Sequence, residues 1–124
     1  MGRIFGGGEA ARKRGEAAED LAATFLTRRG LRIIERNFRE RGGEIDLVCR
    51  QGDEVVFVEV RYRGHGGFGG AGASIDARKR ARLVLAARHW LARHGEQACR
   101  FDCVLMDSLD EAGIEWVRDA FAAD

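Results

Sequence analysis

Two apolar, β-branched segments separated by a short polar turn constrain this chain more than any other feature. The segments cover residues 42–48 and 55–61, and the polar stretch 51–54 lies between them. Gly52 supplies the residue that tight hairpin turns need. The pattern therefore predicts an antiparallel β-hairpin with its turn centred between Gly52 and Asp53.

This register places two acidic side chains directly opposite each other. Asp46 faces Glu59, and Glu44 faces Arg61. Opposed residues have Cβ atoms roughly 4.5–5.5 Å apart, and like charges at that distance are destabilising unless a positive group lies between them. Asp46 and Glu59 are therefore candidate ligands of a divalent cation that prefers oxygen. A solvated acidic face neutralised by Arg61 and Arg63 is the alternative that the same pattern allows.

The opposite face of the hairpin is apolar and predicts one side of the core. It carries Ile45, Leu47, Cys49, Val56, Val58 and Val60. Such a face must be covered by another layer of structure. The rest of the chain should supply that layer.

The remaining segments predict an α/β fold. Their periodicities and turn residues indicate a helix over 9–29, a strand over 31–38, a Gly-rich loop over 64–73, a helix from an N-cap at Ser74 to about residue 94, strands over 100–107 and 114–117, and the start of a short helix over 118–121. The expected architecture is a mixed central sheet of about five strands flanked by helices, in the order α-β-β-β-α-β-β. We expect a single domain over residues 1–124 with a flexible start over 1–8.

Length and composition limit the class of protein. A chain of 124 residues with 45% hydrophobic residues suits one globular domain. No apolar run approaches the roughly 20 residues that a membrane span requires, so we expect no membrane contact. The start of the chain lacks the apolar core of a signal peptide, and three cysteines fit a reducing compartment. We therefore expect a cytoplasmic protein.

Charge is unevenly distributed although the net charge is only +1. Residues 76–100 carry 7 basic and 2 acidic side chains, whereas residues 101–124 carry 1 basic and 7 acidic side chains. The basic segments permit nucleic acid as a partner. The acidic C-terminal segment leaves a protein-interaction subunit as a further option.

Lys79 is predicted to point toward the sheet. On a helical wheel it shares the apolar stripe of Leu83, Ala86 and Trp90. An inward lysine needs an acidic partner or an anionic ligand. A snorkelling side chain at the edge of the core is the alternative.

Seven short segments spread over nearly the whole chain carry a resemblance to a known family. They are Gly15-Glu16, Arg36-Asn37-Phe38, Gly43-Glu44-Ile45-Asp46, Val56-Phe57-Val58-Glu59-Val60, Lys79, Arg100-Phe101-Asp102 and Glu115-Trp116-Val117-Arg118. In this combination the chain resembles the YraN-like family of small bacterial proteins of uncharacterised function. That family is similar to the restriction-endonuclease-like superfamily, near the archaeal Holliday junction resolvases. The resemblance implies a restriction-endonuclease-like core.

The resemblance also implies a metal site. Asp46 and Glu59 would ligate Mg2+ or Mn2+, with the Val60 carbonyl as a further ligand, and Glu16 would match the helical acid that completes such sites. From the residues alone, however, Glu16 lies opposite the apolar stripe of its helix. It joins the site only if the first turn overhangs the edge of the sheet.

Arg61 departs from the superfamily pattern, which usually has lysine at this position. Arginine stays protonated, so it cannot act as a base, but it can stabilise charge on a phosphate. Lys79 is the candidate to replace the missing lysine.

The function implied is a Mg2+- or Mn2+-dependent endonuclease that acts on branched or structured DNA. Arg41, Arg61, Arg63 and Lys79 are the expected contacts to nucleic acid. The alternative is a catalytically silent DNA-binding or scaffold module that keeps the nuclease fold. Arg61 is compatible with both hypotheses. The sequence does not determine the oligomeric state, and a homodimer is one option.

Overall fold

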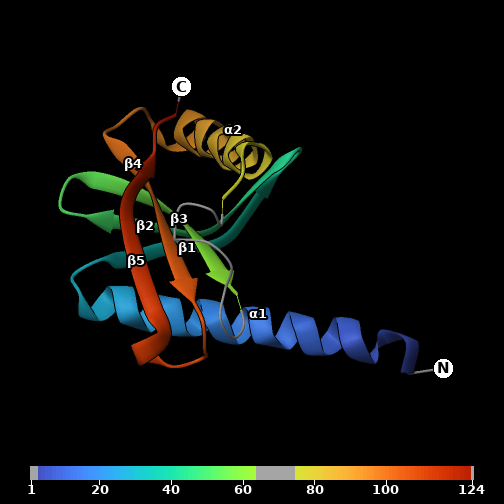
Figure 1. The fold of residues 1–124 in the computed structure, drawn as a ribbon. Helices are drawn as coiled ribbons and strands as arrows, with labels where there is room; N and C mark the ends of the chain where they lie inside the picture. Colours follow the sequence, from blue (N-terminus) through green and yellow to red (C-terminus); the bar gives the residue numbers. More distant parts are fainter. Residues whose placement is uncertain (1–2, 64–74, 124) are drawn as a thin grey trace.

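A five-stranded sheet lies between two helices in the computed structural model, which describes residues 3–63 and 75–123 (Figure 1). The elements are α1 (Arg3–Arg28), β1 (Arg32–Glu40), β2 (Gly43–Gln51), β3 (Glu54–Tyr62), α2 (Ala77–His94), β4 (Cys99–Met106), the 3-10 turn η2 (Glu111–Gly113) and β5 (Ile114–Phe121). This order confirms the predicted α/β class. The Gly-rich loop expected over 64–73 and the N-cap expected at Ser74 lie outside the described residues.

The strands follow one another across the sheet in the order β1-β2-β3-β4-β5. Only β3 and β4 pair in parallel, and the other neighbours pair antiparallel. A parallel pair requires a crossover connection, which contains α2. The β2–β3 register runs from Leu47 opposite Val58 to Gln51 opposite Glu54, as the hairpin turn predicts.

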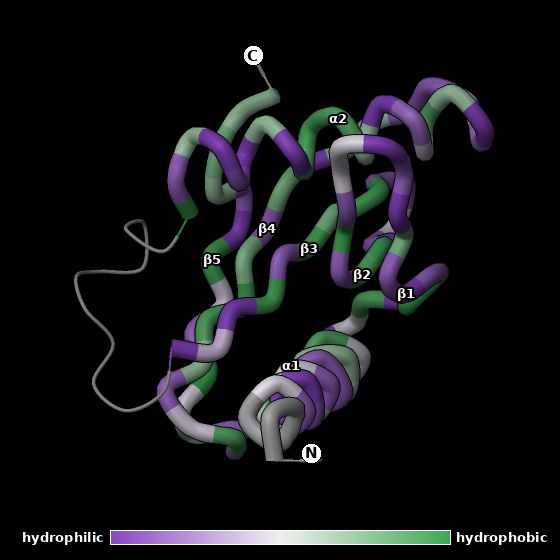
Figure 2. The backbone as a smooth tube through the Cα atoms, turned by 90° about the vertical axis from the view of Figure 1, so that its right-hand side faces the viewer, coloured by the Kyte–Doolittle hydropathy of each residue, from purple (hydrophilic) through white to green (hydrophobic). Residues whose placement is uncertain are grey.

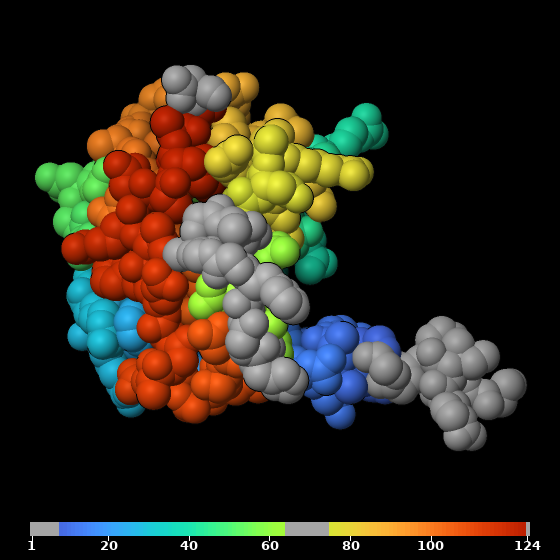
Figure 3. All heavy atoms as spheres, viewed as in Figure 1, coloured from blue at the N-terminus to red at the C-terminus, as the bar shows by residue number. Residues whose placement is uncertain are grey.

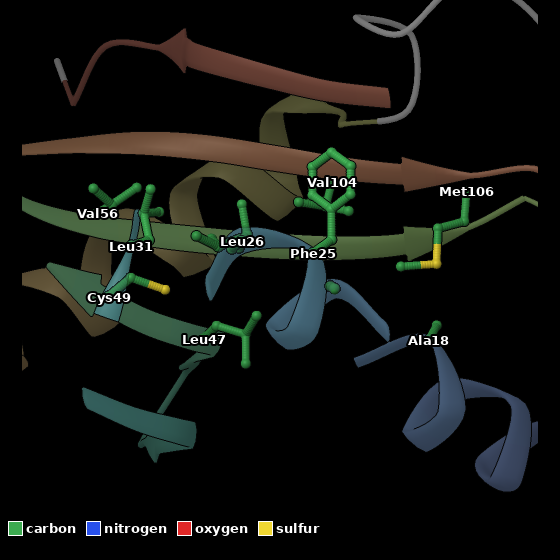
Figure 4. Packing of buried hydrophobic residues seen from close by; sticks show 11 residues of the cluster. Ala18, Phe25, Leu26, Leu31, Leu47, Cys49, Val56, Val104 and Met106 are labelled. Atoms are coloured by element: carbon green, nitrogen blue, oxygen red, sulfur yellow. The ribbon is translucent and has the colours of Figure 1, made fainter. Parts of the chain in front are cut away.

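Helix α1 covers one face of the sheet with its apolar stripe. Ala18, Ala22, Phe25 and Leu26 pack against Leu47, Cys49, Val56, Val58, Val104 and Met106 (Figure 4). The helical residues recur at the spacing of one helix face, which is why a single stripe can bury them together. The predicted apolar face of the hairpin therefore forms this half of the core, with Ile45 as the exception.

Helix α2 covers the other face of the sheet. Val48, Val55 and Phe57 are completely buried there, and Phe57 meets Trp90 of α2 edge to ring with centroids 5.8 Å apart. The alternative of a solvated face on this side of the hairpin is therefore wrong. Ile45 also packs on this side, beside its cross-strand partner Phe38.

A left-handed backbone residue accompanies this change of face at Ile45. Asn37 in β1 has φ 55°, and it lies between Arg36, which pairs with Leu47, and Phe38, which pairs with Ile45.

Three element ends differ from the sequence-based expectations. Helix α1 begins at Arg3, inside the range expected to be flexible. Helix α2 is capped by Asp76, whose side chain accepts the Lys79 backbone N–H at 2.8 Å. The short helix expected over 118–121 is wrong, because β5 continues to Phe121. There Phe121 pairs with Phe101 of β4.

The helices differ in how far they extend along the sheet. In the view turned by 90°, the strands lie between α1 and α2 (Figure 2). The N-terminal part of α1 projects past the rest of the molecule (Figure 1). No helix in residues 3–63 or 75–123 is both long and apolar enough to cross a membrane.

Candidate functional site

Asp46 and Glu59 lie directly beyond Leu47 and Val58, the last pair of the β2–β3 ladder on the side away from the turn. Asp46 is 9% exposed and Glu59 is 3% exposed, although carboxylates are almost never buried without a partner. The Val60 backbone N–H donates to Asp46 Oδ2 at 2.8 Å, so the Asp46 carboxyl reaches the neighbouring strand directly beside Glu59. Two carboxyl groups from adjacent strands thus share one buried position.

Lys79 supplies the positive charge next to this pair. Its Nζ lies 3.1 Å from Glu59 Oε2. The lysine stands in the first turn of α2, and the Asp76 cap fixes the start of that helix. Lys79 therefore points toward the sheet, as the helical wheel predicts, and its partner is acidic.

The electrostatics of the pair favour a bound proton or cation at Asp46. Burial, and then the nearby charge of Glu59, raise the pKa of Asp46 from its usual 3.8 to about 8, against the lowering effect of the Val60 hydrogen bond. At neutral pH the carboxyl therefore keeps its proton unless another positive charge replaces it. A metal ion would have to displace that proton.

The acid on α1 that approaches Asp46 is Glu19. Burial, and then the charge of Asp46, raise the pKa of Glu19, and Asn37 Nδ2 donates to Glu19 Oε1 at 3.1 Å. The left-handed φ of Asn37 thus belongs to a residue whose amide holds a carboxyl of the site. Asparagine is one of the few residues that adopt this backbone conformation readily.

Glu16, the helical acid that the resemblance implies, is exposed on α1. It lines a groove of about 450 Å³ with Glu19 and residues of β1. The structure therefore places Glu19, one turn further along, where it interacts electrostatically with Asp46, and leaves Glu16 exposed at that groove. Glu19 was missed because it borders the apolar stripe directly after Ala18, a position that periodicity alone does not mark as part of a site.

The expected cross-strand pair between Glu44 and Arg61 is not formed in the described part of the chain. Glu44 Oε1 lies 3.3 Å from Arg82 Nη2 instead, because α2 lies over the start of β2. Arg61 is half-buried, and its backbone pairs with Leu105 of β4. Its charge acts on the thiol of Cys103, whose register partner is Glu59.

The two other arginines expected to contact nucleic acid have different surroundings. Arg63 is largely buried, with Nη2 3.0 Å from Asp107 Oδ1 and 3.9 Å from Glu115 Oε1. Arg41 is exposed in the turn between β1 and β2. Arg41 is thus free to meet a ligand, whereas Arg63 is already held by two carboxylates.

Asp46 and Glu59 are the side chains best placed to hold a metal ion. Within the described ranges, no three His, Cys, Asp or Glu side chains are grouped so that they could hold one together. Mg2+ is commonly bound by one or two carboxylates, with water and substrate phosphates as the other ligands. Burial raises the pKa of Cys49 and of Cys103 to about 12, so these free cysteines stay protonated thiols of the core.

Comparison with known proteins finds relatives along most of the chain. The model of "Uncharacterised protein family UPF0102" matches residues 18–106, which include Glu19, Asp46, Glu59 and Lys79 and exclude Glu16. A "UPF0102 protein" of Dechloromonas aromatica is 60% identical over 111 residues, covering 90% of each chain. Another, of Methylobacillus flagellatus, is 56% identical over 109 residues, covering 88% of this chain and 96% of the relative. A third, of Nitrosomonas europaea, is 53% identical over 109 residues, covering 87% and 92%.

Proposed function

The chain belongs to uncharacterised protein family UPF0102, the YraN family, and from its site we propose a Mg2+- or Mn2+-dependent endonuclease that acts on branched or structured DNA. The order of helices and strands agrees with the restriction-endonuclease-like core that the resemblance implies. Fold alone does not determine activity, so the proposal depends on the residues of the site.

One observation carries the proposal, namely that two buried carboxyl groups and one ammonium group converge from three elements. Asp46 and Glu59 would hold the metal ion, together with the Val60 carbonyl. When bound, the ion would polarise the phosphate and make water a better nucleophile. Lys79, 3.1 Å from Glu59, would stabilise the negative charge that develops on the phosphate oxygens. The raised pKa of Asp46 fits a position that gains from a cation.

Arg61 and Lys79 divide the roles that a single lysine has in the superfamily pattern. Arg61 keeps its proton, so its role is charge stabilisation. Lys79 is amino-terminal in α2, where the helix dipole also favours a bound anion. Both groups would attract a phosphodiester to the end of β3.

A catalytically silent DNA-binding module is the second candidate. It is favoured by the ion pair of Lys79 with Glu59, which already neutralises one of the two carboxylates. Under this hypothesis the site binds nucleic acid or stabilises the fold, and no phosphodiester bond is cleaved. A carboxylate pair without a metal would then be a structural element of a binding surface.

Cleavage by wild type and by Asp46→Asn separates the two candidates. Both proteins are incubated with linear, flap and four-way branched DNA, with Mn2+ or with EDTA, and the products are resolved on gels. Asp53→Asn is the matched control, because Asp53 is exposed in the β2–β3 turn. Metal-dependent cleavage that Asp46→Asn abolishes and Asp53→Asn retains is the expected result.

Two other outcomes have definite meanings. Shifted but intact DNA in every lane would favour the binding module. Neither cleavage nor a shift would contradict both candidates and favour a protein partner for the acidic C-terminal segment. In EDTA at neutral pH, binding by Asp46→Asn should equal that of wild type, because the raised pKa of Asp46 leaves its carboxyl protonated. Above about pH 8 the variant should bind more tightly, because the substitution then removes a negative charge near the DNA backbone.

A further inference from the structure

Helix α2 is basic on its outer side over its whole length. It contains no acidic residue. Its arginines are Arg78, Arg80, Arg82, Arg88 and Arg93. All of them are exposed, whereas Lys79 turns inward to Glu59.

Three of these arginines have no carboxylate within 4 Å among the residues that the structure describes. Arg82 pairs with Glu44 and Arg93 pairs with Glu40, but Arg78, Arg80 and Arg88 do not form ion pairs there. Like charges spaced four residues apart on a helix, such as Arg78 and Arg82, destabilise it slightly. A helix surface of this kind gains from an external polyanion.

Arg80 and Arg88 stand at two points of a groove between α2 and the end of β5. The groove has a volume of about 630 Å³, and small residues such as Ala77 and Ala81 line it together with Phe121. Figure 3 shows the start of α2 in yellow directly beside β5 in red. The helical rise places Arg80 and Arg88 about 12 Å apart along the axis. Several phosphates of one DNA strand fit in that length, since they are roughly 3.4 Å apart along the duplex axis.

Acidic residues gather on the opposite side of the molecule. The connection between β4 and β5 contains Asp107, Asp110 and Glu111, and it lies across the sheet from α2 in Figure 1. Glu111 there pairs with Arg28 at the end of α1. Asp107 there pairs with Arg63, whereas Arg78, Arg80 and Arg88 form no ion pair among the described residues. The uncompensated positive charge of α2 attracts an approaching polyanion.

We propose that the outer surface of α2, through Arg78, Arg80 and Arg88, binds the sugar–phosphate backbone of the nucleic acid beyond the site. This binding surface rests on the proposed function, and it would hold the part of the nucleic acid that extends beyond Asp46 and Glu59. The guanidinium group suits it because its planar fork binds phosphate through two parallel hydrogen bonds. Lys79 connects the two regions, because the first turn of α2 forms one wall of the site and the start of this surface.

Salt-dependent binding of the full chain tests the proposal. Fluorescence anisotropy is measured with labelled four-way and duplex DNA between 50 and 200 mM salt, in EDTA so that no cleavage intervenes. The double variant Arg80→Gln, Arg88→Gln is compared with wild type. The control Arg28→Gln, Arg29→Gln removes the same charge at the acidic side. Thermal melts confirm that all three proteins are folded.

The expected change is in the salt slope. Each lost phosphate contact lowers the slope of log affinity against log salt by about 0.9, so two contacts lower it by about 1.8. The loss of affinity between 50 and 200 mM salt should then be about 12-fold smaller in the α2 variant than in wild type. The control should keep the wild-type slope.

Each contrary outcome points to a different failure. If wild type binds DNA and the α2 variant has the same affinity and slope, the α2 surface is refuted and the proposed function stands. If wild type binds no DNA at any salt, the proposed function fails and the α2 surface fails with it. A third outcome is that wild type binds polyglutamate but not DNA, and that Arg80→Gln, Arg88→Gln weakens the binding of polyglutamate. The surface would then bind an acidic protein, and the proposal would be overturned.

Discussion

Replacing Asp46 by asparagine should stabilise the protein at high pH. The pKa of Asp46 is raised, so the native state holds this proton more tightly than the unfolded chain does. The contribution of Asp46 to the stability of the wild type is therefore largest below the usual pKa of about 4 and is lost as the pH rises toward about 8. Asparagine resembles the protonated form, because its carbonyl can still accept from Val60 N–H and its amide can donate to Glu59.

The size of the effect follows from the rise in pKa. Each pH unit between native and unfolded pKa values is worth about 1.36 kcal/mol, so the rise from 3.8 to about 8 sets an upper limit of roughly 6 kcal/mol. Relaxation and water entry reduce the cost of a buried charge, so we expect about 3 kcal/mol above pH 8. In a chain of 124 residues this corresponds to roughly 10 °C in Tm. Near pH 4 the two proteins should unfold at similar temperatures.

Urea and thermal unfolding at pH 4, 6, 8 and 9 in EDTA measure this difference. Glu44→Gln is the control, because Glu44 is a neighbouring carboxylate that is half-exposed and already paired with Arg82. Its stability relative to wild type should change little over the same range. An Asp46→Asn variant that is as unstable at pH 9 as wild type, or less stable, would refute the conclusion that burial beside Glu59 raises the pKa of Asp46.

Substitutions at Lys79 and Gly43, each with a comparison variant, test the contacts around the site. Lys79→Met should lower the free energy of unfolding by about 2 kcal/mol, because it leaves Glu59 buried without its cation, and Lys79→Arg should restore part of the loss. Urea titrations at pH 8 measure these differences. Equal stabilities of wild type and Lys79→Met would show that the ion pair contributes nothing. Gly43→Ala should lower the free energy of unfolding by about 2–3 kcal/mol, since the added Cβ would lie 2.5 Å from a backbone oxygen of α2. Gly15→Ala should instead stabilise α1 by about 0.5–1 kcal/mol, because its added Cβ would have nothing within 4 Å. A similar change in Tm for both glycine variants would contradict this close approach.

The hairpin and its charged pair were predictable because their determinants are local. The turn at Gly52 fixes the register, and the register brings Asp46 and Glu59 together. The orientation of Lys79 was predictable for the same reason, since the period of α2 follows from its own sequence. Local patterns thus determined both carboxylates and the cation between the sheet and α2.

Features that depend on how distant elements meet were not predictable in this way. The choice of Glu19 over Glu16 depends on where α1 crosses the sheet, which its own period does not specify. The helix expected over 118–121 is strand because Asp119 N–H donates at 2.8 Å to Asp102, a buried carboxylate of β4. The same carboxylate accepts from Trp116 and Arg100, so β5 is fixed by contacts outside its own segment.

The backbone at Asn37 limits which amino acids this position can carry. With φ at 55°, glycine, asparagine and aspartate are the residues that fit without strain. Glycine has no amide to donate to Glu19, and aspartate would add a negative charge to a cluster that already contains Glu19 and Asp46. Asparagine is the one residue that meets the demands of both the chain path and the charge, so the two requirements leave position 37 a single solution.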